Sequence, residues 1–185
     1  MKMTNVLSFS MLSSMLLLAG CAAPEPTAVN QLHNEVGKLN QQMRQLTDQA
    51  TVLEQQNQLN SGAAQGAWLL PNANTAVLLQ SNVGELRLSL SHVEAEANGT
   101  RALLHIRAAG EQPLVPLTAL VEWGELDPIT GKPLAADRQS QSIELPSSLL
   151  PKAETTVSLR LSGIQPEQLG YVRVHDLVPL QSAGR

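Results

Sequence analysis

The amino-acid sequence predicts an all-β domain, an immunoglobulin-like antiparallel β-sandwich, preceded by an N-terminal helical stalk of coiled-coil type. Two observations predict this fold class. From Trp68 onward, apolar residues recur at every second position, which is typical of strands with one buried face. Before that point, Val29 to Asn60 carries apolar residues in a heptad repeat, which indicates a long helix. Residues 66–181 contain no helical run long enough to build βαβ units, so we expect an antiparallel domain.

The clearest strand pair flanks Asn98-Gly99. Leu86, Leu88 and Leu90 alternate with polar residues before it, and residues 102–108 alternate after it. Asn-Gly is the strongest short hairpin signal, because both residues tolerate a positive φ. Further strands are expected near Thr75–Gln80, Leu117–Trp123, Gln141–Leu145, Thr155–Leu161 and Tyr171–Leu177. About seven short strands over roughly 110 residues favour a sandwich, and a small barrel is the alternative.

The heptad repeat places apolar residues at positions a and d. The a series is Val29, Val36, Met43, Ala50 and Asn57, and the d series is Leu32, Leu39, Leu46, Leu53 and Asn60. Leucine at d with valine at a favours a parallel dimer. Positions e and g carry no complementary charges, so the simplest interpretation is a homo-oligomer formed through residues 29–60. A single amphipathic helix that packs on its own domain is the alternative.

The first twenty residues have the composition of a secretory signal. Lys2 precedes an uncharged stretch rich in Leu and Met over residues 6–18, and small residues follow at positions 19 and 20. The stretch is too short to span a ~30 Å hydrocarbon layer as a helix, which needs about 20 residues. We therefore expect residues 1–20 to be removed by cleavage between Gly20 and Cys21.

Cys21 is the single cysteine of the chain, and Leu18-Ala19-Gly20 directly precedes it. This segment resembles the lipobox of bacterial lipoprotein precursors. The resemblance implies an S-diacylglycerol thioether and an N-acyl group on Cys21, with fatty acyl chains such as palmitate. Two or more such chains hold a protein stably at a membrane. An ordinary secretory signal with a chance cysteine is the alternative, and residues 21–28, with two prolines, are expected to form a flexible tether.

Composition excludes several classes of partner. The net charge of −4 leaves no basic surface for nucleic acid. Phe9 belongs to the signal, so only Trp68, Trp123 and Tyr171 remain, too few for a stacking platform for bases or sugars. Lipidation of Cys21 leaves no thiol for a disulfide, a metal or a nucleophile.

No catalytic, cofactor-binding or metal-binding pattern is present. The sequence lacks a Gly-x-Ser-x-Gly elbow, a His-x-x-x-His pair and an acidic calcium loop, so we expect a protein that is not an enzyme. His105 and His175 are expected on solvated strand faces, and His92 at the edge of its strand.

Three acids surround one of the tryptophans. Glu122, Glu125 and Asp127 flank Trp123, and a solvated acidic turn is a simpler interpretation than a pair of glycosidase carboxylates. Trp68 and Trp123 themselves are expected to pack in the core or at its edge.

Two further segments resemble one family. The first joins Gly66-Ala67-Trp68-Leu69-Leu70-Pro71 with Val83-Gly84-Glu85-Leu86-Arg87-Leu88-Ser89-Leu90, and the second is Gln168-Leu169-Gly170-Tyr171-Val172-Arg173-Val174-His175-Asp176. With the lipobox and the heptads, they are similar to the YajI-type lipoproteins of enteric-like bacteria. The resemblance covers essentially the whole chain and is weakest over residues 126–140. It implies a small β-sandwich domain of unknown function on a lipid anchor, and no catalytic residues.

Together these features predict a non-enzymatic envelope lipoprotein that faces the periplasm and positions its β domain to bind another protein. Ala22 rather than aspartate follows Cys21, which in lipoprotein sorting implies the outer membrane rather than the inner one. The alternative is a module that binds an envelope glycan or lipid. The expected segments are the signal peptide (1–20), the lipidated tether (21–28), the helical stalk (29–61) and the β-sandwich (66–181).

Overall fold

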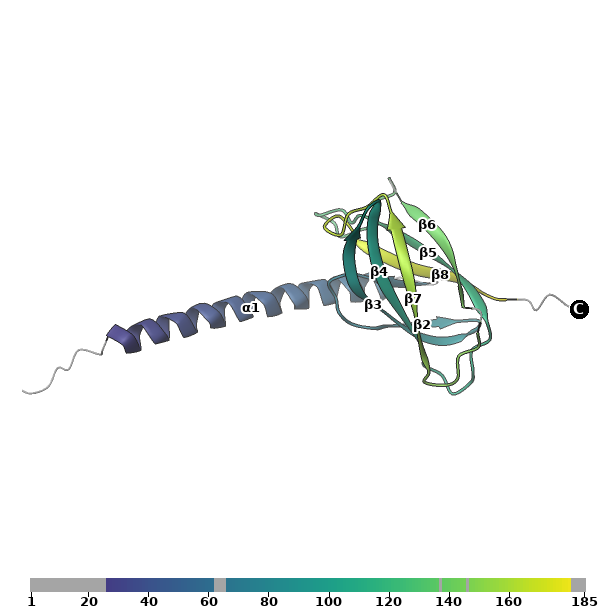
Figure 1. Cartoon of the computed structure of the whole chain (residues 1–185), viewed down its shortest axis with the longest axis horizontal. Helices are drawn as coiled ribbons and strands as arrows, with labels where there is room; N and C mark the ends of the chain where they lie inside the picture. The colour runs from purple at the N-terminus through teal and green to yellow at the C-terminus, as the bar shows by residue number, and fades with distance from the viewer. Residues whose placement is uncertain (1–25, 62–65, 137, 146, 181–185) are drawn as a thin grey trace, which may run out of the picture. The chain divides into compact units, whose positions relative to one another are not determined.

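The computed structural model describes residues 26–61, 66–136, 138–145 and 147–180 (Figure 1). The chain divides into two compact units, Met1–Arg44 and Gln45–Arg185. One helix, α1 (Pro26–Ser61), contributes residues to both units, and the strands all belong to the second. Cys21 and the expected cleavage site at Gly20 lie outside the described residues.

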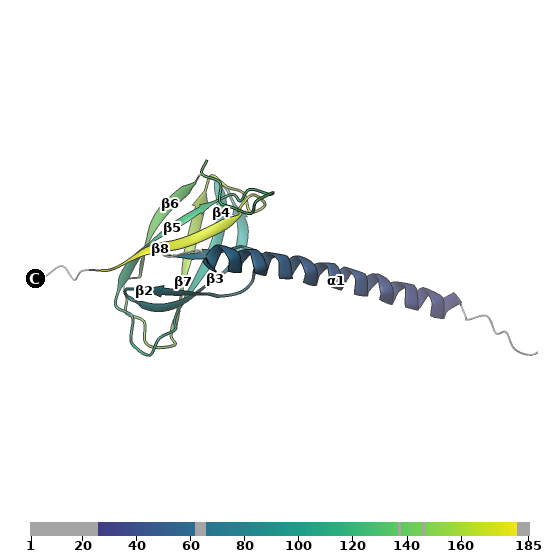
Figure 2. The same ribbon diagram turned by 180° about the vertical axis from the view of Figure 1, so that it is seen from behind.

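Eight strands are found among the described residues. They are β1 (Ala67–Leu69), β2 (Val77–Ser81), β3 (Gly84–Glu96), β4 (Gly99–Ala108), β5 (Leu117–Gly124), β6 (Gln139–Leu145), β7 (Glu154–Ser162) and β8 (Tyr171–Pro179). They form two antiparallel four-stranded sheets, ordered β1-β8-β5-β6 and β2-β3-β4-β7. Figures 1 and 2 show the two sheets as separate layers, so the predicted β-sandwich after an N-terminal helix is confirmed and the barrel is not.

The core lies between the sheets and follows the period-two pattern. Leu86, Leu88 and Leu104 point inward from one sheet, and Val121 and Val174 from the other, all of them at most 2% exposed. Burying each such side chain contributes about 1.5–3 kcal/mol relative to leaving it in water. The strands therefore form where alternation gives one apolar face to bury.

The hairpin between β3 and β4 is shifted by one residue from its expected position. Glu96 pairs with Gly99, so the two turn residues are Ala97 and Asn98, and Gly99 is the first residue of β4. Gly99 has φ +152, and a Cβ there would collide with the carbonyl oxygen of Leu161 on β7. Glycine is thus required by the neighbouring strand rather than by the turn itself.

The helix begins earlier than its heptads. It starts at Pro26, inside the segment 21–28 that the sequence assigns to an extended tether. Proline suits the first turn of a helix, because the amide hydrogen it lacks would have no partner there and its fixed φ is already helical.

The edge strands on the two sides of the sandwich differ in length. On one side the sheets end in β1 and β2, which contact each other and are three and five residues long. On the other they end in β6 and β7, which are seven and nine residues long. Both β6 and β7 pair with their neighbours without any shift of register. We call the β6–β7 side the open side.

Candidate functional site

An apolar stripe is exposed on α1, and we call it the seam. It consists of Val29, Leu32, Val36, Leu39, Met43 and Leu46, each between 50% and 64% exposed. These are the successive a and d positions of the first three heptads. Single exposed apolar residues are ordinary, but a contiguous apolar surface marks a site of interaction.

The last turns of α1 pack against the β domain through two amide side chains. Asn60 accepts a hydrogen bond from the backbone N–H of Trp68 (2.9 Å) and donates one to the carbonyl of the same residue (2.8 Å). Gln56, which is 1% exposed, accepts from the N–H of Leu70 (2.8 Å) and donates to the carbonyl of Thr75 (3.4 Å). These side chains satisfy backbone groups at and beside the edge strand β1.

The apolar residues of the heptad repeat are therefore exposed in the first part of α1, whereas its last turns contact the β domain. Leu53 and Leu59 are half-buried, whereas Asn57 is exposed. The alternative interpretation, a helix that packs on its own domain, is found for these last turns. The seam ends at Leu46, one heptad before the docked leucine at position 53.

A buried carboxylate lies on the sheet that contains β5 and β8. Glu122 is 8% exposed and accepts a hydrogen bond from the hydroxyl of Tyr171 (3.1 Å). Its other oxygen lies 3.6 Å from Arg138 and 4.0 Å from Nε2 of His175. Burial, and then the charge of Glu122, raises the pKa of Tyr171 to about 12.

Two expectations fail at this cluster. Glu122 was expected in a solvated turn and His175 on a solvated face, yet each side chain is only 11% exposed. Gly66, just before β1, lies so close to His175 that a Cβ there would be 2.9 Å from the histidine Cβ. Asp127 does form the expected turn, because its carboxylate accepts hydrogen bonds from the backbone N–H groups of Thr130 and then Ile129, which lower the pKa of Asp127.

The two tryptophans pack as expected. The ring of Trp68 lies 5.0 Å from that of Tyr171, and the guanidinium of Arg173 stands 4.8 Å from the Trp68 centroid. Trp123 is 3% exposed, and its ring N–H donates to the carbonyl of Ser162 (3.2 Å). Neither ring is presented as a stacking platform, so the structure gives them packing roles.

On the opposite sheet, three side chains meet in the order of a hydrolase triad. Ser91 Oγ lies 2.7 Å from His105 Nε2, and His105 Nδ1 lies 3.2 Å from Glu154 Oε1. This contact is not apparent from the sequence, which predicts an isolated His105 on a solvated strand face. Ser91 also contacts Nδ1 of His92 (2.9 Å), and Thr156 also contacts Nδ1 of His105 (3.2 Å). The Glu154 carboxylate is half exposed, so the group is a polar network on an open sheet face.

His92 was expected at a strand edge and lies instead inside β3, at a β-bulge. Between Ser91 and Glu94 the strand advances three residues while β4 advances two, and His92 has φ +49. Ser91 lies before the bulge, in the regular part of the ladder, where Ser89 pairs with His105 and Ser91 is the diagonal neighbour of His105 on the same face.

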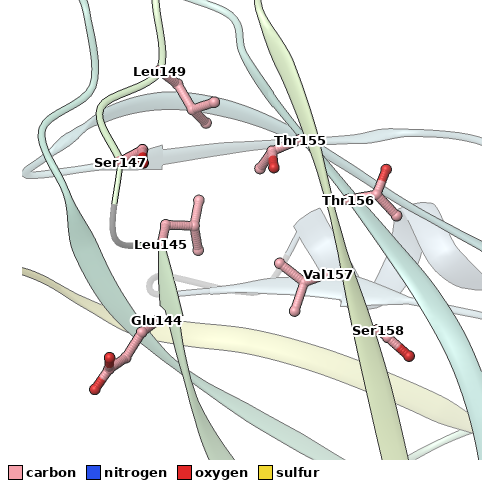
Figure 3. A pocket seen from close by; sticks show the side chains of 8 residues that line it. All are labelled: Glu144, Leu145, Ser147, Leu149, Thr155, Thr156, Val157 and Ser158. Atoms are coloured by element: carbon pink, nitrogen blue, oxygen red, sulfur yellow. The ribbon is translucent and has the colours of Figure 1, made fainter.

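A cavity of about 390 Å³ opens between β6 and β7, on the open side (Figure 3). Its lining consists of Glu144, Leu145, Ser147, Leu149, Thr155, Thr156, Val157 and Ser158. In Figure 3 the side chains of Leu145, Leu149 and Val157 point toward one another, whereas Glu144 points away. Neither Ser91 nor His105 lines this cavity.

Two classes of site are not found in the part of the chain that the structure describes. Its residues include no group of three or more His, Cys, Asp or Glu side chains that could hold a metal ion. Its one helix does not combine the length and hydrophobicity that a membrane span requires.

Comparison with known proteins places the chain in a family. Residues 21–183 match the family model described as "Protein of unknown function (DUF3251)". The chain is 35% identical over 177 residues to the uncharacterized lipoprotein YajI of Escherichia coli (strain K12), covering 96% of this chain and 98% of the relative. The resemblance seen in the sequence is thereby confirmed.

Solved structures agree with this assignment. The solution NMR structure of YajI from Escherichia coli superposes with a TM-score of 0.67 at 34% identity, over 74% of this chain and 82% of that one. The trimeric lipoprotein SadB of Salmonella enterica has a similar fold, with a TM-score of 0.52 at 20% identity over 82% of this chain and 84% of its own. The chain belongs to the YajI-type lipoprotein family.

Proposed function

We propose that this lipoprotein is anchored through Cys21 to the outer membrane and faces the periplasm. There its seam joins copies of the chain into a parallel homo-oligomer, and the β-sandwich of each copy binds another envelope protein. The observation that carries the proposal is the seam, six large apolar side chains at heptad spacing and at least half exposed.

The number of chains is proposed to be three. Leucine at d with valine at a favours two strands, but Met43 and Ala50 occupy a positions and weaken that preference. SadB, which shares the fold, is trimeric, and this supports three chains over two.

Sedimentation equilibrium tests the assembly. A chain that begins at Ala22 is expected to sediment as a trimer. A chain that begins at Gln45 keeps the whole second unit but lacks most of the seam, and it is expected to be a monomer. If the longer chain is also a monomer, the seam has another role and the proposal is wrong.

The anchor rests on Cys21 and the residues around it. Ala22 after the cysteine supports the outer membrane as the destination. Cells fed an alkyne analogue of palmitate should label the wild-type protein but not the Cys21→Ser variant. Density-gradient separation of the two membranes should place the labelled protein in the outer fraction, and Ala22→Asp should move it to the inner one.

A role without catalysis is part of the proposal. Although Ser91, His105 and Glu154 contact one another in triad order, a nucleophilic serine also needs donors for the oxyanion and a cleft for the substrate. The cavity between β6 and β7 is lined by neither Ser91 nor His105. A fluorophosphonate probe should leave the folded protein unlabelled, and labelling that disappears in Ser91→Ala would show a hydrolase instead.

A further inference from the structure

The cavity on the open side borders the free edge of a strand. Thr155, Thr156, Val157 and Ser158 are consecutive residues of β7, and all four line it. Successive side chains of a strand point to opposite faces. Four neighbours in a row can line one cavity only if it also meets the backbone edge between them. In Figure 3, β7 forms one wall of the cavity along this stretch.

Between Glu154 and Arg160, this edge carries none of the devices that usually block strand addition. β7 is nine residues long, pairs with β4 on one side and occupies the last position of its sheet. It contains no proline, no glycine and no bulge, and its charged residues, Glu154 and Arg160, stand near its ends. Natural proteins normally protect an edge of this length with lysines, prolines or bulges.

An apolar recess lies beside the edge. Leu145 from β6, Leu149 and Val157 point into the cavity. Leu150, the next residue in the chain after Leu149, is 68% exposed. Val115 is 49% exposed, and it follows Leu114, which forms a β-bridge with Leu149. The recess therefore has both an apolar floor and exposed apolar residues nearby.

Among the described residues that line the cavity, a single one is ionisable, and it is acidic. It is Glu144 on β6, whose side chain points away from the recess toward solvent. Glu154, the first residue of β7, adds a second carboxylate, which is half exposed, whereas the cationic Arg160 stands near the other end of the strand. A cationic side chain on a bound partner would therefore be attracted to Glu144 and Glu154.

We propose that β7 binds an extended segment of a partner protein by strand addition, with an aliphatic side chain in the recess and a Lys or Arg beside Glu144. This inference names the binding surface within the proposed function, on which it rests. Main-chain hydrogen bonds to β7 provide affinity, and the recess selects an aliphatic residue at one alternate position of the segment.

The probe is the synthetic peptide Lys-Thr-Val-Thr-Leu-Thr-Val-Lys, with blocked ends. It is titrated into ¹⁵N-labelled protein that retains every described residue, and backbone amide signals are followed. We expect saturable shifts confined to β6, β7 and the segment between them. Only every second amide of an added strand faces β7, so N-methylation of one set of alternate peptide amides should abolish binding and N-methylation of the other set should not. Replacing the terminal lysines by glutamates should weaken binding about tenfold.

Two variants locate the site. Val157→Lys places a charge in the recess and should weaken binding at least tenfold. Leu78→Lys makes the same kind of change on β2, the opposite edge strand of the same sheet, and should leave binding unchanged. If Val157→Lys does not fold, Leu150→Lys near the recess takes its place. Shifts that fall on β1 or β2, or no saturable binding, would overturn the inference.

Its failure is distinguishable from failure of the proposed function. The peptide titration measures binding at the surface of one β domain, whereas sedimentation measures association through the seam on α1. If the protein is a trimer but does not bind the peptide, the β7 site is wrong and the proposed assembly stands. If it is a monomer but binds the peptide, the proposed assembly is wrong and the β7 site stands.

Discussion

Asn60 and Trp68 are joined by two hydrogen bonds, in which the side-chain amide of one meets both backbone groups of the other. A neighbouring β-strand would supply the edge of β1 with the same two groups, one hydrogen-bond acceptor and one donor. The helix therefore completes a short strand that would otherwise leave its donor and acceptor to water.

Asn60→Ala removes both bonds to Trp68 and should lower the free energy of unfolding by roughly 1–3 kcal/mol, the range for losing partners of part-buried polar groups. Urea denaturation followed by tryptophan fluorescence measures the change. Asn57→Ala is the matched control, because Asn57 is on the same helix and exposed, and it should shift stability by less than about 0.5 kcal/mol. Equal effects of the two variants would show that the Trp68 contact contributes nothing.

Leu39→Asp places a carboxylate in the middle of the seam and should dissociate the oligomer, because a charge at a d position is desolvated on association. Sedimentation equilibrium on the chain from Ala22 should then give the monomer mass. Gln41→Asp adds the same charge outside the a and d positions and should keep the wild-type mass. An oligomer that survives Leu39→Asp would mean that the chains associate elsewhere.

Tyr171 is the single tyrosine, so its ionisation can be followed by absorbance without interference. Its pKa in the folded protein is about 12, against an ordinary value near 10. A raised folded pKa contributes stability that is fully present below pH 10 and is lost as the pH rises through 12. Stability should therefore fall between about pH 10 and pH 12.

Glu122→Gln tests the cause of that shift. It removes the neighbouring charge but leaves Tyr171 buried, so the pKa should move part of the way back toward its ordinary value. A wild-type midpoint near 10 in protein that is still folded would contradict the assigned environment of the phenol.

Gly99→Ala should destabilise the fold by roughly 1–3 kcal/mol, because φ at this residue is +152 and the new methyl meets the carbonyl oxygen of Leu161. Gly110→Ala is the control, since the nearest atom to a Cβ there is the backbone nitrogen of Gln112 at 4.0 Å. Thermal unfolding of both variants provides the comparison. If Gly99→Ala unfolds at the same temperature as the wild type, β7 can move aside to accommodate the methyl group.

Much of the sandwich could be predicted because the alternation of buried and exposed residues is a local property. Leu86, Leu88 and Leu90 indicate their strand without knowledge of its partners, and this prediction is confirmed. The exact hairpin register is not local. Gly99 reads as a turn residue in the sequence, but its neighbour across the sheet, Leu161, lies far along the chain.

The polar contacts could not be predicted for the same reason. The approach of Ser91 to His105 depends on the register of β3 against β4, which makes the two residues diagonal neighbours, and the sequence predicts the turn of this hairpin one residue away from its actual position. The burial of Glu122 depends on Tyr171, 49 residues away. The sequence does predict strands near Gln141–Leu145 and Thr155–Leu161, but only the sheet order shows that both are edge strands.

The docking of Asn60 also limits the length of any coiled coil that α1 can form. Beyond Ala50 the d face of the helix is occupied by its own domain, so a second helix cannot follow the heptads to their end. Supercoiling is confined to residues 29–50, about 33 Å at 1.5 Å per residue. The sandwich thus acts as a stop, and any association of helices has to be supplied by the first three heptads alone.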